Sequence, residues 1–226
     1  MSIKLNYLGT TKVFDKNVKL IDLIPAGDEK KYICARVNNL VRELSYEVHG
    51  DADIEFCTIA DRDSMRIYEA SLRYVVAMAF DRVYPGLKIR FSNNVSRSIF
   101  VQLLDSSTRA DLHMVKAINE EVARIIKADY KFTRSLVKTN DAEAVYKEHG
   151  LLDKIAILKY RPEETVHLYE CEGYYNYMNS RMVPSTGYLK DYKILYYSPG
   201  LIIQYPRSEC NGQIPRFKDA PTFGKV

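Results

Sequence analysis

The sequence contains no tryptophan, few cysteines, and no apolar run close to the 18 residues that a membrane-spanning helix requires. Its start lacks the charged segment, apolar run and small-residue cleavage site of a signal peptide. The cysteines form no Cys-x-x-Cys pair and stand widely apart, at Cys34, Cys57, Cys171 and Cys210. These absences predict a cytoplasmic protein with free thiols and without a membrane partner.

A phosphate-binding P-loop is also missing. Such a loop needs a glycine-rich turn followed by lysine and a hydroxyl residue. The nearest fragment is Gly224-Lys225, where Asp219 stands at the first glycine position and Val226 at the hydroxyl position. We therefore expect this chain neither to bind ATP tightly nor to transfer a phosphoryl group.

Clusters of basic or metal-ligating residues are scarce. The net charge is +4, and Lys30-Lys31 is the one place where two basic residues are adjacent, so a tRNA partner is allowed but not indicated. The four histidines are isolated. His167 and Cys171 lie about 13 Å apart if residues 166–170 form a strand. We predict no metal ligands and no catalytic residues, since no Ser/His/Asp or Cys/His set can be named.

What is present begins with a β-rich stretch over residues 1–60. Ile3, Leu5 and Tyr7 alternate with polar residues, and residues 12–14 follow Gly9, which predicts a hairpin. Residues 18–24 predict a short apolar helix stopped by Pro25. Two further strands are expected around a turn at residues 38–39, and a last one over residues 54–58. This order predicts a β-grasp, ubiquitin-like sheet.

Residues 61–205 predict a second, α+β domain. A long helix is expected over residues 64–84, with a wide apolar surface that indicates a buried position. Thr108 and Asp111 resemble a capping box at the start of a second helix. Its inward face is predicted to hold Leu112, Val115, Ile118, Val122, Ile125 and Ile126. Residues 141–149 predict a third helix, and residues 192–205 a hairpin with a type II turn at Pro199-Gly200.

The last stretch, residues 206–226, holds three of the eight prolines and no apolar periodicity. It predicts a linker or docking tail towards a further domain. We expect this tail to be either mobile or extended, and in the second case laid along the second domain by Ile214 and Phe217. The ending at Gly224-Lys225-Val226 is not typical of a natural domain end, so we expect the sequence to be a piece of a longer protein.

Two stretches resemble known families. Residues 3–60, with the run Ala35 to Asn39 followed by Glu43-Leu44, resemble a TGS domain. Asn39 and Glu43 depart mildly from the Val-Asn-Gly and Asp-Leu pattern of that family. Residues 61–205 resemble the second N-terminal domain of threonyl-tRNA synthetases, on the helix around residues 68–71 and the segment Met182 to Gly187. The resemblance implies an α+β fold like the editing domain of those enzymes.

In threonyl-tRNA synthetases that domain is a metal-using hydrolase with a His-x-x-x-His helix and a Cys-x-x-x-His segment. Here Ala70 and Tyr74 stand at the helical histidines, and Met178 and Met182 at the cysteine and the last histidine. Cys171 could serve as a ligand only through an insertion. Alanine cannot ligate a metal, and phenol or thioether groups replace imidazole and thiolate poorly. The resemblance therefore implies that the editing chemistry is lost.

The order of segments also resembles bacterial uridine kinase-like nucleoside kinases, which place a P-loop kinase domain after such a region. The matching pieces are residues 187–189, 199–200, 204–206 and 214–217. This implies a non-catalytic regulatory module whose partner is a C-terminal kinase domain, absent here, that uses ATP and magnesium. The alternatives are a tRNA-related binding or aminoacyl-tRNA editing factor of the threonyl-tRNA synthetase type, and a domain serving interaction or oligomerisation.

The resemblance also implies a cleft between the helix over residues 64–84 and the segment 182–189. Two alternatives are open for it: tyrosine rings fill it, or it holds a nucleoside, nucleotide or amino-acid-like ligand by stacking and hydrogen bonding. The candidate ligand-binding residues are Arg66, Tyr68, Arg73, Tyr74, Tyr175, Ser185 and Thr186, with Tyr177 beside them.

Overall fold

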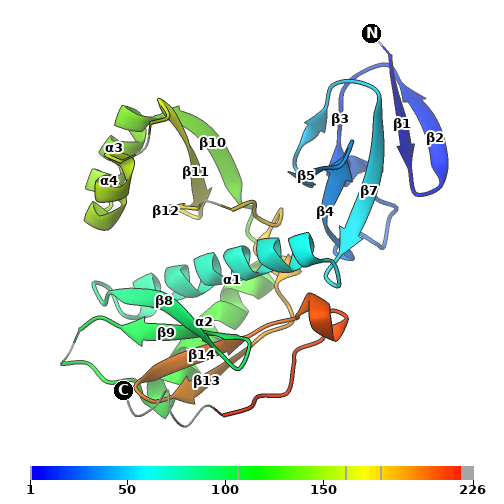
Figure 1. Cartoon of the computed structure of the whole chain (residues 1–226). Coiled ribbons are helices and arrows are strands. Elements are labelled where there is room, and N and C mark those ends of the chain that lie inside the picture. Colours follow the sequence, from blue (N-terminus) through cyan, green and yellow to red (C-terminus); the bar gives the residue numbers. More distant parts are fainter. Residues whose placement is uncertain (1, 106, 161, 179, 220–226) are drawn as a thin grey trace.

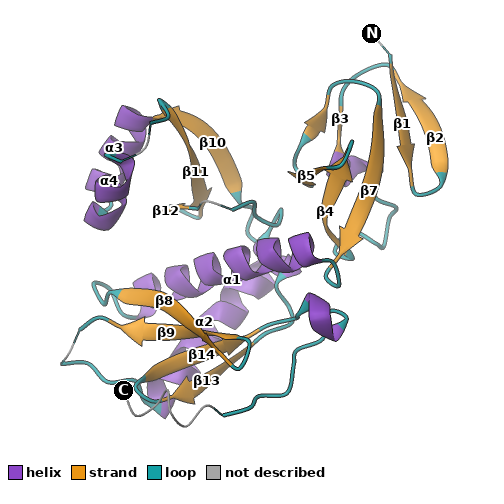
Figure 2. Ribbon diagram, viewed as in Figure 1, coloured by secondary structure: helices purple, strands orange, loops and turns teal. Residues whose placement is uncertain are grey.

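The computed structural model describes residues 2–105, 107–160, 162–178 and 180–219, and these form a mixed arrangement of helices and separate sheets (Figures 1 and 2). A five-stranded sheet is formed by the first 58 residues, and a four-stranded and a three-stranded sheet by later ones. The predicted α+β class is therefore confirmed.

The five-stranded sheet has the order β2-β1-β7-β4-β5, with β1 and β7 parallel. Its strands are β1 (Ile3–Tyr7), β2 (Thr10–Phe14), β4 (Tyr32–Val37), β5 (Leu40–Glu43) and β7 (Ala52–Thr58). The predicted alternation holds, because Ile3, Leu5 and Tyr7 are buried and the residues between them are exposed. The predicted turn between β4 and β5 is confirmed, with Asn38 and Asn39 at positive φ.

The helix expected over residues 18–24 is a single 3-10 turn, Leu20–Leu23, after a short strand β3 (Val18–Lys19) that pairs with β6 (Glu47–Val48). The N–H groups of Leu20 and Ile21 donate to the carbonyls of Tyr46 and Leu44. The Ile24 N–H donates to the carbonyl of Ile21, three residues earlier, which is the hydrogen bond of a 3-10 turn and not of an α-helix.

Helix α1 (Arg62–Val83) follows directly and confirms the long buried helix. Its N-cap is Asp61, whose side chain accepts a hydrogen bond from the N–H of Asp63. Helix α2 (Leu112–Ala128) differs from the prediction at its start. Asp111 is itself the N-cap and accepts from the Met114 N–H, so the capping box at Thr108 was wrong. Leu112, predicted to face inward, is 73% exposed. It is the first residue of α2, and the buried face of the helix begins at Met114.

Helices α1 and α2 pack together, and α2 also contacts the four-stranded sheet. That sheet has the order β13-β14-β9-β8, from β8 (Ile89–Val95), β9 (Ser98–Leu103), β13 (Lys193–Tyr197) and β14 (Gly200–Gln204). The predicted hairpin is confirmed, but its turn is not the expected one. Tyr197 pairs with Gly200, so Gly200 belongs to the strand and the turn consists of Ser198 and Pro199, joined by a cis bond.

The three-stranded sheet stands apart in Figure 1, at the upper left. It has the order β10-β11-β12, from β10 (Thr133–Lys138), β11 (Thr165–Cys171) and β12 (Tyr174–Tyr177). Helices α3 (Thr139–Glu148) and α4 (Leu152–Leu158) cover one face through a small core around Tyr146, Val166 and Leu168. The other face carries Arg134 and its cross-strand neighbour Tyr169.

The described part of the tail starts beside α1, where the Ser208 nitrogen lies 3.4 Å from the Met65 sulfur, and ends on the four-stranded sheet. Phe217 packs beside Tyr197 at a centroid distance of 5.7 Å, and the Lys218 N–H donates to Ser96 at 2.7 Å. Residues 206–219 contain one 3-10 turn (Ser208–Cys210) and an isolated bridge between Arg207 and Gln213. Residues 220–226 lie outside the described residues. No helix in the described part of the chain has the length and apolar character needed to cross a bilayer.

Candidate functional site

The tyrosines predicted for the cleft are part of the core. Tyr68 and Tyr74 on α1 are at most 2% exposed. The Tyr68 hydroxyl donates to the carbonyl of Asp191 and accepts from its N–H, at 3.0 and 2.9 Å. The Tyr74 hydroxyl lies 2.6 Å from the carbonyl of Tyr174 and 3.2 Å from that of Tyr169. Burial raises the pKa of both phenols, so both stay neutral.

The arginines predicted beside them lie elsewhere. Arg66 is exposed on α1. Arg73 pairs with Glu69 at 2.6 Å, one turn earlier on the same helix, and its guanidinium lies over the ring of Phe91 on β8. Tyr175 packs against the small core between the three-stranded sheet and its helices, with its ring centroid 4.7 Å from that of His149.

The two hydroxyl residues of the segment after β12 bind the end of helix α2. Thr186 donates to the carbonyl of Ile125 and accepts from the N–H of Tyr130, at 2.8 and 2.9 Å. Ser185 hydrogen-bonds to Asp129 at 2.5 Å. The structure therefore does not bring the seven predicted side chains together.

Asp129 organises a contact between the two halves of the chain. It pairs with Lys30 at 2.5 Å and accepts from Ser185 and from the Gly187 N–H. Burial raises the pKa of Asp129, but the hydrogen bonds from Lys30, Ser185 and Gly187 outweigh it, so the net pKa is lowered. A Cβ on Gly187 would overlap both the Asp129 carboxylate and the Lys30 ammonium.

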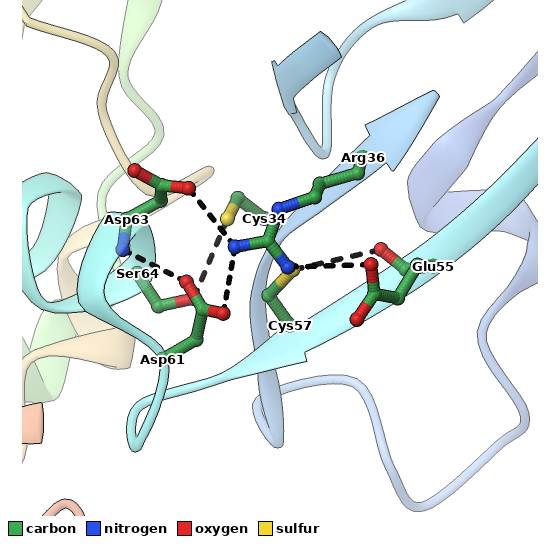
Figure 3. A network of polar contacts seen from close by, with 7 residues as sticks. All are labelled: Cys34, Arg36, Glu55, Cys57, Asp61, Asp63 and Ser64. Atoms are coloured by element: carbon green, nitrogen blue, oxygen red, sulfur yellow. Dashed lines mark hydrogen bonds and ion pairs between the residues drawn. The ribbon is translucent and has the colours of Figure 1, made fainter. Parts of the chain in front are cut away.

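A second polar junction lies where β7 leads into α1 (Figure 3). Arg36 donates to Asp61 at 2.7 Å and to Asp63 at 2.9 Å, and its other terminal nitrogen lies 3.3 Å from Glu55 and from the Cys57 sulfur. The guanidinium thereby joins the sheet to the N-cap of the helix.

A buried carboxylate lies at the contact between the five-stranded and the three-stranded sheet. Glu43, at the end of β5, is 7% exposed and accepts from the Met182 N–H at 2.8 Å and from the Tyr169 hydroxyl. Arg134 of β10 lies 3.7 Å from it. Burial raises the pKa of Tyr169 and Glu43 adds to that rise, whereas Arg134 and Arg181 oppose it.

A hollow of about 160 Å³ adjoins this cluster. We call it the seam hollow, and its lining consists of Arg134, Val166, His167, Tyr169, Tyr177, Met178, Ser180 and Arg181. Of the predicted cleft residues it includes Tyr177 alone. A larger open hollow, about 630 Å³, lies on the exposed face of the five-stranded sheet between the β1–β2 and β4–β5 turns.

No protein-family model matches the sequence. Over 191 residues the chain is 25% identical to the threonine–tRNA ligase of Prochlorococcus marinus strain MIT 9515, and over 193 residues it is 27% identical to threonine–tRNA ligase 1 of Bacillus subtilis strain 168. The chain resembles part of a threonine–tRNA ligase. Each match covers 83% of this chain and 30% of the relative, so the chain spans about a third of the length of these curated proteins.

Three of the four positions that the resemblance assigns to metal ligands are packed here, whereas Met178 is partly buried and lines the seam hollow. Ala70 and Met182 are buried, and the Met182 sulfur lies 3.7 Å from the Ser71 hydroxyl, which also accepts from the Val183 N–H. The Tyr74 ring meets Phe132 and Tyr174 edge-on, at centroid distances of 5.3 and 5.2 Å. Among the described residues no three His, Cys, Asp or Glu side chains are grouped as a metal site would require.

Sequence reasoning missed the residues around the seam hollow. Glu43 stood out only as a departure from the TGS pattern, and its burial inside a polar cluster depends on Tyr169 and Met182, more than 120 residues away. Arg134 and Arg181 look like ordinary surface charges in the sequence. The one sequence signal for this cluster is a carboxylate at a buried strand position, because a buried charge requires a charged or hydrogen-bonding partner.

Proposed function

We propose that this chain is a non-hydrolytic, tRNA-related binding module of the threonyl-tRNA synthetase type. One observation carries the proposal: a chain similar to threonine–tRNA ligases over 191 residues has packed side chains, Tyr74 and Met182, where the hydrolytic metal would be held. Within this proposal the β1–β7 unit is a TGS domain of the β-grasp type, and residues 61–205 form the editing-domain-like part.

In this proposal the chain binds tRNA as an aminoacyl-tRNA editing factor does, but it does not hydrolyse aminoacyl-tRNA. Metal-assisted hydrolysis needs ligands that leave an open coordination position for water. The hydroxyl of Tyr74 instead donates a hydrogen bond to a backbone carbonyl, and the sulfur of Met182 accepts from the Ser71 hydroxyl. The residues present do not fit a catalytic metal.

The test is tRNA binding followed by fluorescence anisotropy, with a threonine tRNA transcript and an unrelated tRNA of equal length. We expect salt-dependent binding that favours the threonine tRNA, together with deacylation of mischarged threonine tRNA at the rate without protein. No tRNA binding at low salt would refute the proposal. Deacylation above background would show that an editing activity persists.

A second candidate is a regulatory module of a uridine kinase-like nucleoside kinase, which rests on the residues quoted for that resemblance. Ile214 to Phe217, one of its matching pieces, lies in the tail that packs on the four-stranded sheet, where Gln204 donates to the Pro215 carbonyl at 3.2 Å. The similar proteins are threonine–tRNA ligases, which favours the first candidate. Reading the coding sequence downstream of Val226 decides: a Gly-x-x-x-x-Gly-Lys-Ser/Thr motif there would supply the kinase partner with its ATP and magnesium site.

A further inference from the structure

The seam hollow lies between residues that are far apart in sequence. Arg134 comes from β10, Tyr169 from β11, and Arg181 from the segment that follows β12. Arg134 and Tyr169 are direct cross-strand neighbours, so they present their side chains on the same face of the sheet, the one not covered by α3. That face meets β5 of the first sheet through Glu43.

The charges around the hollow do not balance. Two guanidinium groups, from Arg134 and Arg181, adjoin one carboxylate, that of Glu43. Arg181 has no ion pair with any residue in the described part of the chain. One positive charge beside the hollow is therefore uncompensated.

Within the described residues, neither Arg134 nor Arg181 donates a hydrogen bond to another protein group. Glu43 already accepts hydrogen bonds from the Met182 N–H, the Tyr169 hydroxyl and the Ser45 hydroxyl. Arg134 approaches it only to 3.7 Å, which is an ion pair without a hydrogen bond. A guanidinium has five N–H donors in a planar fork that matches the oxygens of a phosphate.

The size of the hollow selects a small group. Its volume of about 160 Å³ lies below the range of about 300–1,000 Å³ that is usual for pockets that bury a drug-sized ligand, and this favours a small group such as a phosphate. The hydroxyl of Ser180 on the lining adds a neutral hydrogen-bonding group.

We propose that the seam hollow binds a phosphate group through Arg134 and Arg181. The phosphate belongs either to the backbone of an RNA or to a free mononucleotide whose base and sugar remain outside. The RNA source rests on the function proposed above, whereas the nucleotide source does not.

The test uses the full 226-residue chain and Arg181→Ala, with Arg90→Ala as the matched control. Arg90 is exposed on β8, so its loss removes the same charge far from the hollow. Inorganic phosphate, AMP and the threonine tRNA transcript are titrated separately, by melting temperature and calorimetry for the first two and by anisotropy for the third. Arg134→Lys is the second variant, because it keeps a positive charge near Glu43 but removes the two-pronged donor.

We expect phosphate or AMP to raise the melting temperature of the wild type and of Arg90→Ala, and to leave that of Arg181→Ala unchanged. Arg134→Lys should bind several-fold more weakly. If RNA supplies the phosphate, Arg181→Ala weakens tRNA binding about tenfold or more and reduces the slope of log affinity against log salt by about one. Arg90→Ala should change neither.

Equal effects of Arg181→Ala and Arg90→Ala would overturn the site, since charge alone would then explain the loss. If tRNA binds Arg181→Ala as tightly as the wild type and neither phosphate nor AMP binds, the site is wrong and the tRNA function stands. If AMP binds in an Arg181-dependent way and tRNA does not bind, the site stands and the tRNA function is wrong. Binding of none of the three refutes both.

Discussion

Glu43 on β5 accepts a hydrogen bond from the backbone N–H of Met182 at 2.8 Å, across 139 positions of sequence. The carboxylate comes from the five-stranded sheet, whereas the N–H belongs to a residue that the resemblance assigns to a metal-ligand position. Met182 thus has a buried thioether, and its backbone N–H donates to a residue of the five-stranded sheet. In this chain the segment around Met182 is hydrogen-bonded to the five-stranded sheet.

Replacement of Glu43 by alanine should destabilise the fold by about 2–4 kcal/mol, because the Met182 N–H and the Tyr169 hydroxyl lose a charged acceptor inside the protein. Urea unfolding measures it. Glu47→Ala is the control, because Glu47 is exposed on β6 and should change stability by less than about 0.5 kcal/mol. A cost for Glu43→Ala no larger than the control's would mean that the cluster does not join the units.

Tyr74 fills the core beside α1, and two substitutions separate its ring from its hydroxyl. Tyr74→Phe should cost about 1–2 kcal/mol, for the lost hydrogen bond to the Tyr174 carbonyl. Tyr74→Ala should cost about 3–5 kcal/mol, because the space between Phe132 and Tyr174 is emptied. Tyr160→Ala, at a tyrosine 90% exposed, should be nearly neutral. If Tyr74→Ala proved as mild, the ring would line an opening and not the core.

Arg36→Ala should cost about 1–3 kcal/mol, because Asp61 and Asp63 lose their charge-assisted hydrogen bonds at the start of α1. Arg90→Ala, which removes the same charge at an exposed position of β8, controls for charge alone. Thermal unfolding with far-UV circular dichroism gives both values. An equal loss of stability in the two variants would show that the contacts of Arg36 with Asp61 and Asp63 make no specific contribution.

The cost of losing Arg36 should depend on pH. Burial raises the pKa of Asp61, but the hydrogen bonds from Arg36 and the Asp63 N–H outweigh it, so its folded-state pKa lies below the ordinary value. A lowered folded pKa contributes stability that is present above the unfolded pKa, about 3.9, and is lost as the pH falls through the folded value. The difference between wild type and Arg36→Ala should therefore be full at pH 7 and shrink below pH 4. A constant difference from pH 7 to pH 3 would contradict the assignment.

Protein prepared without chelators should contain far less than one zinc ion per chain by elemental analysis, since Ala70, Tyr74, Met178 and Met182 replace the ligands. Addition of EDTA should leave the melting temperature unchanged, because no folding free energy comes from a metal. One tightly held zinc per chain would show that other residues supply the site.

Phe217→Ala should lower stability by about 1–2 kcal/mol, because its half-buried ring packs on Tyr197 and the core around Phe100. Hydrogen exchange of the Lys218 amide, which donates to Ser96, should become faster in the same variant. Arg216→Ala, at the exposed neighbour, is the control. Unchanged exchange would mean that the ring does not anchor the tail.

Much of the local structure followed from periodicity. The strands with alternating burial, the long helix α1 and the hairpin of β13 and β14 were all predictable, because each depends on residues close together in the chain. The start of α2 was missed because two acceptors, Thr108 and Asp111, competed for one N-cap, and Thr108 hydrogen-bonds to Asp105 instead.

The candidate site was harder to predict for a physical reason. Ser185, Thr186 and Tyr68 carry hydroxyl groups suited to a ligand, yet partners distant in sequence occupy them: Asp129, Ile125 and Asp191. Whether a polar group faces a ligand or a distant backbone atom depends on tertiary packing. The resemblance supplied the right elements and could not supply those partners.

Gly187 has a consequence for relatives of this chain. Any side chain at this position would enter the space of the Lys30–Asp129 ion pair, which ties a loop of the first unit to the end of α2. A homologue with a side chain here must displace the Lys30 and Asp129 side chains and so rearrange this ion pair. The residue at this position in an alignment would therefore indicate which relatives keep the ion pair, whereas the Glu43–Met182 hydrogen bond does not depend on it.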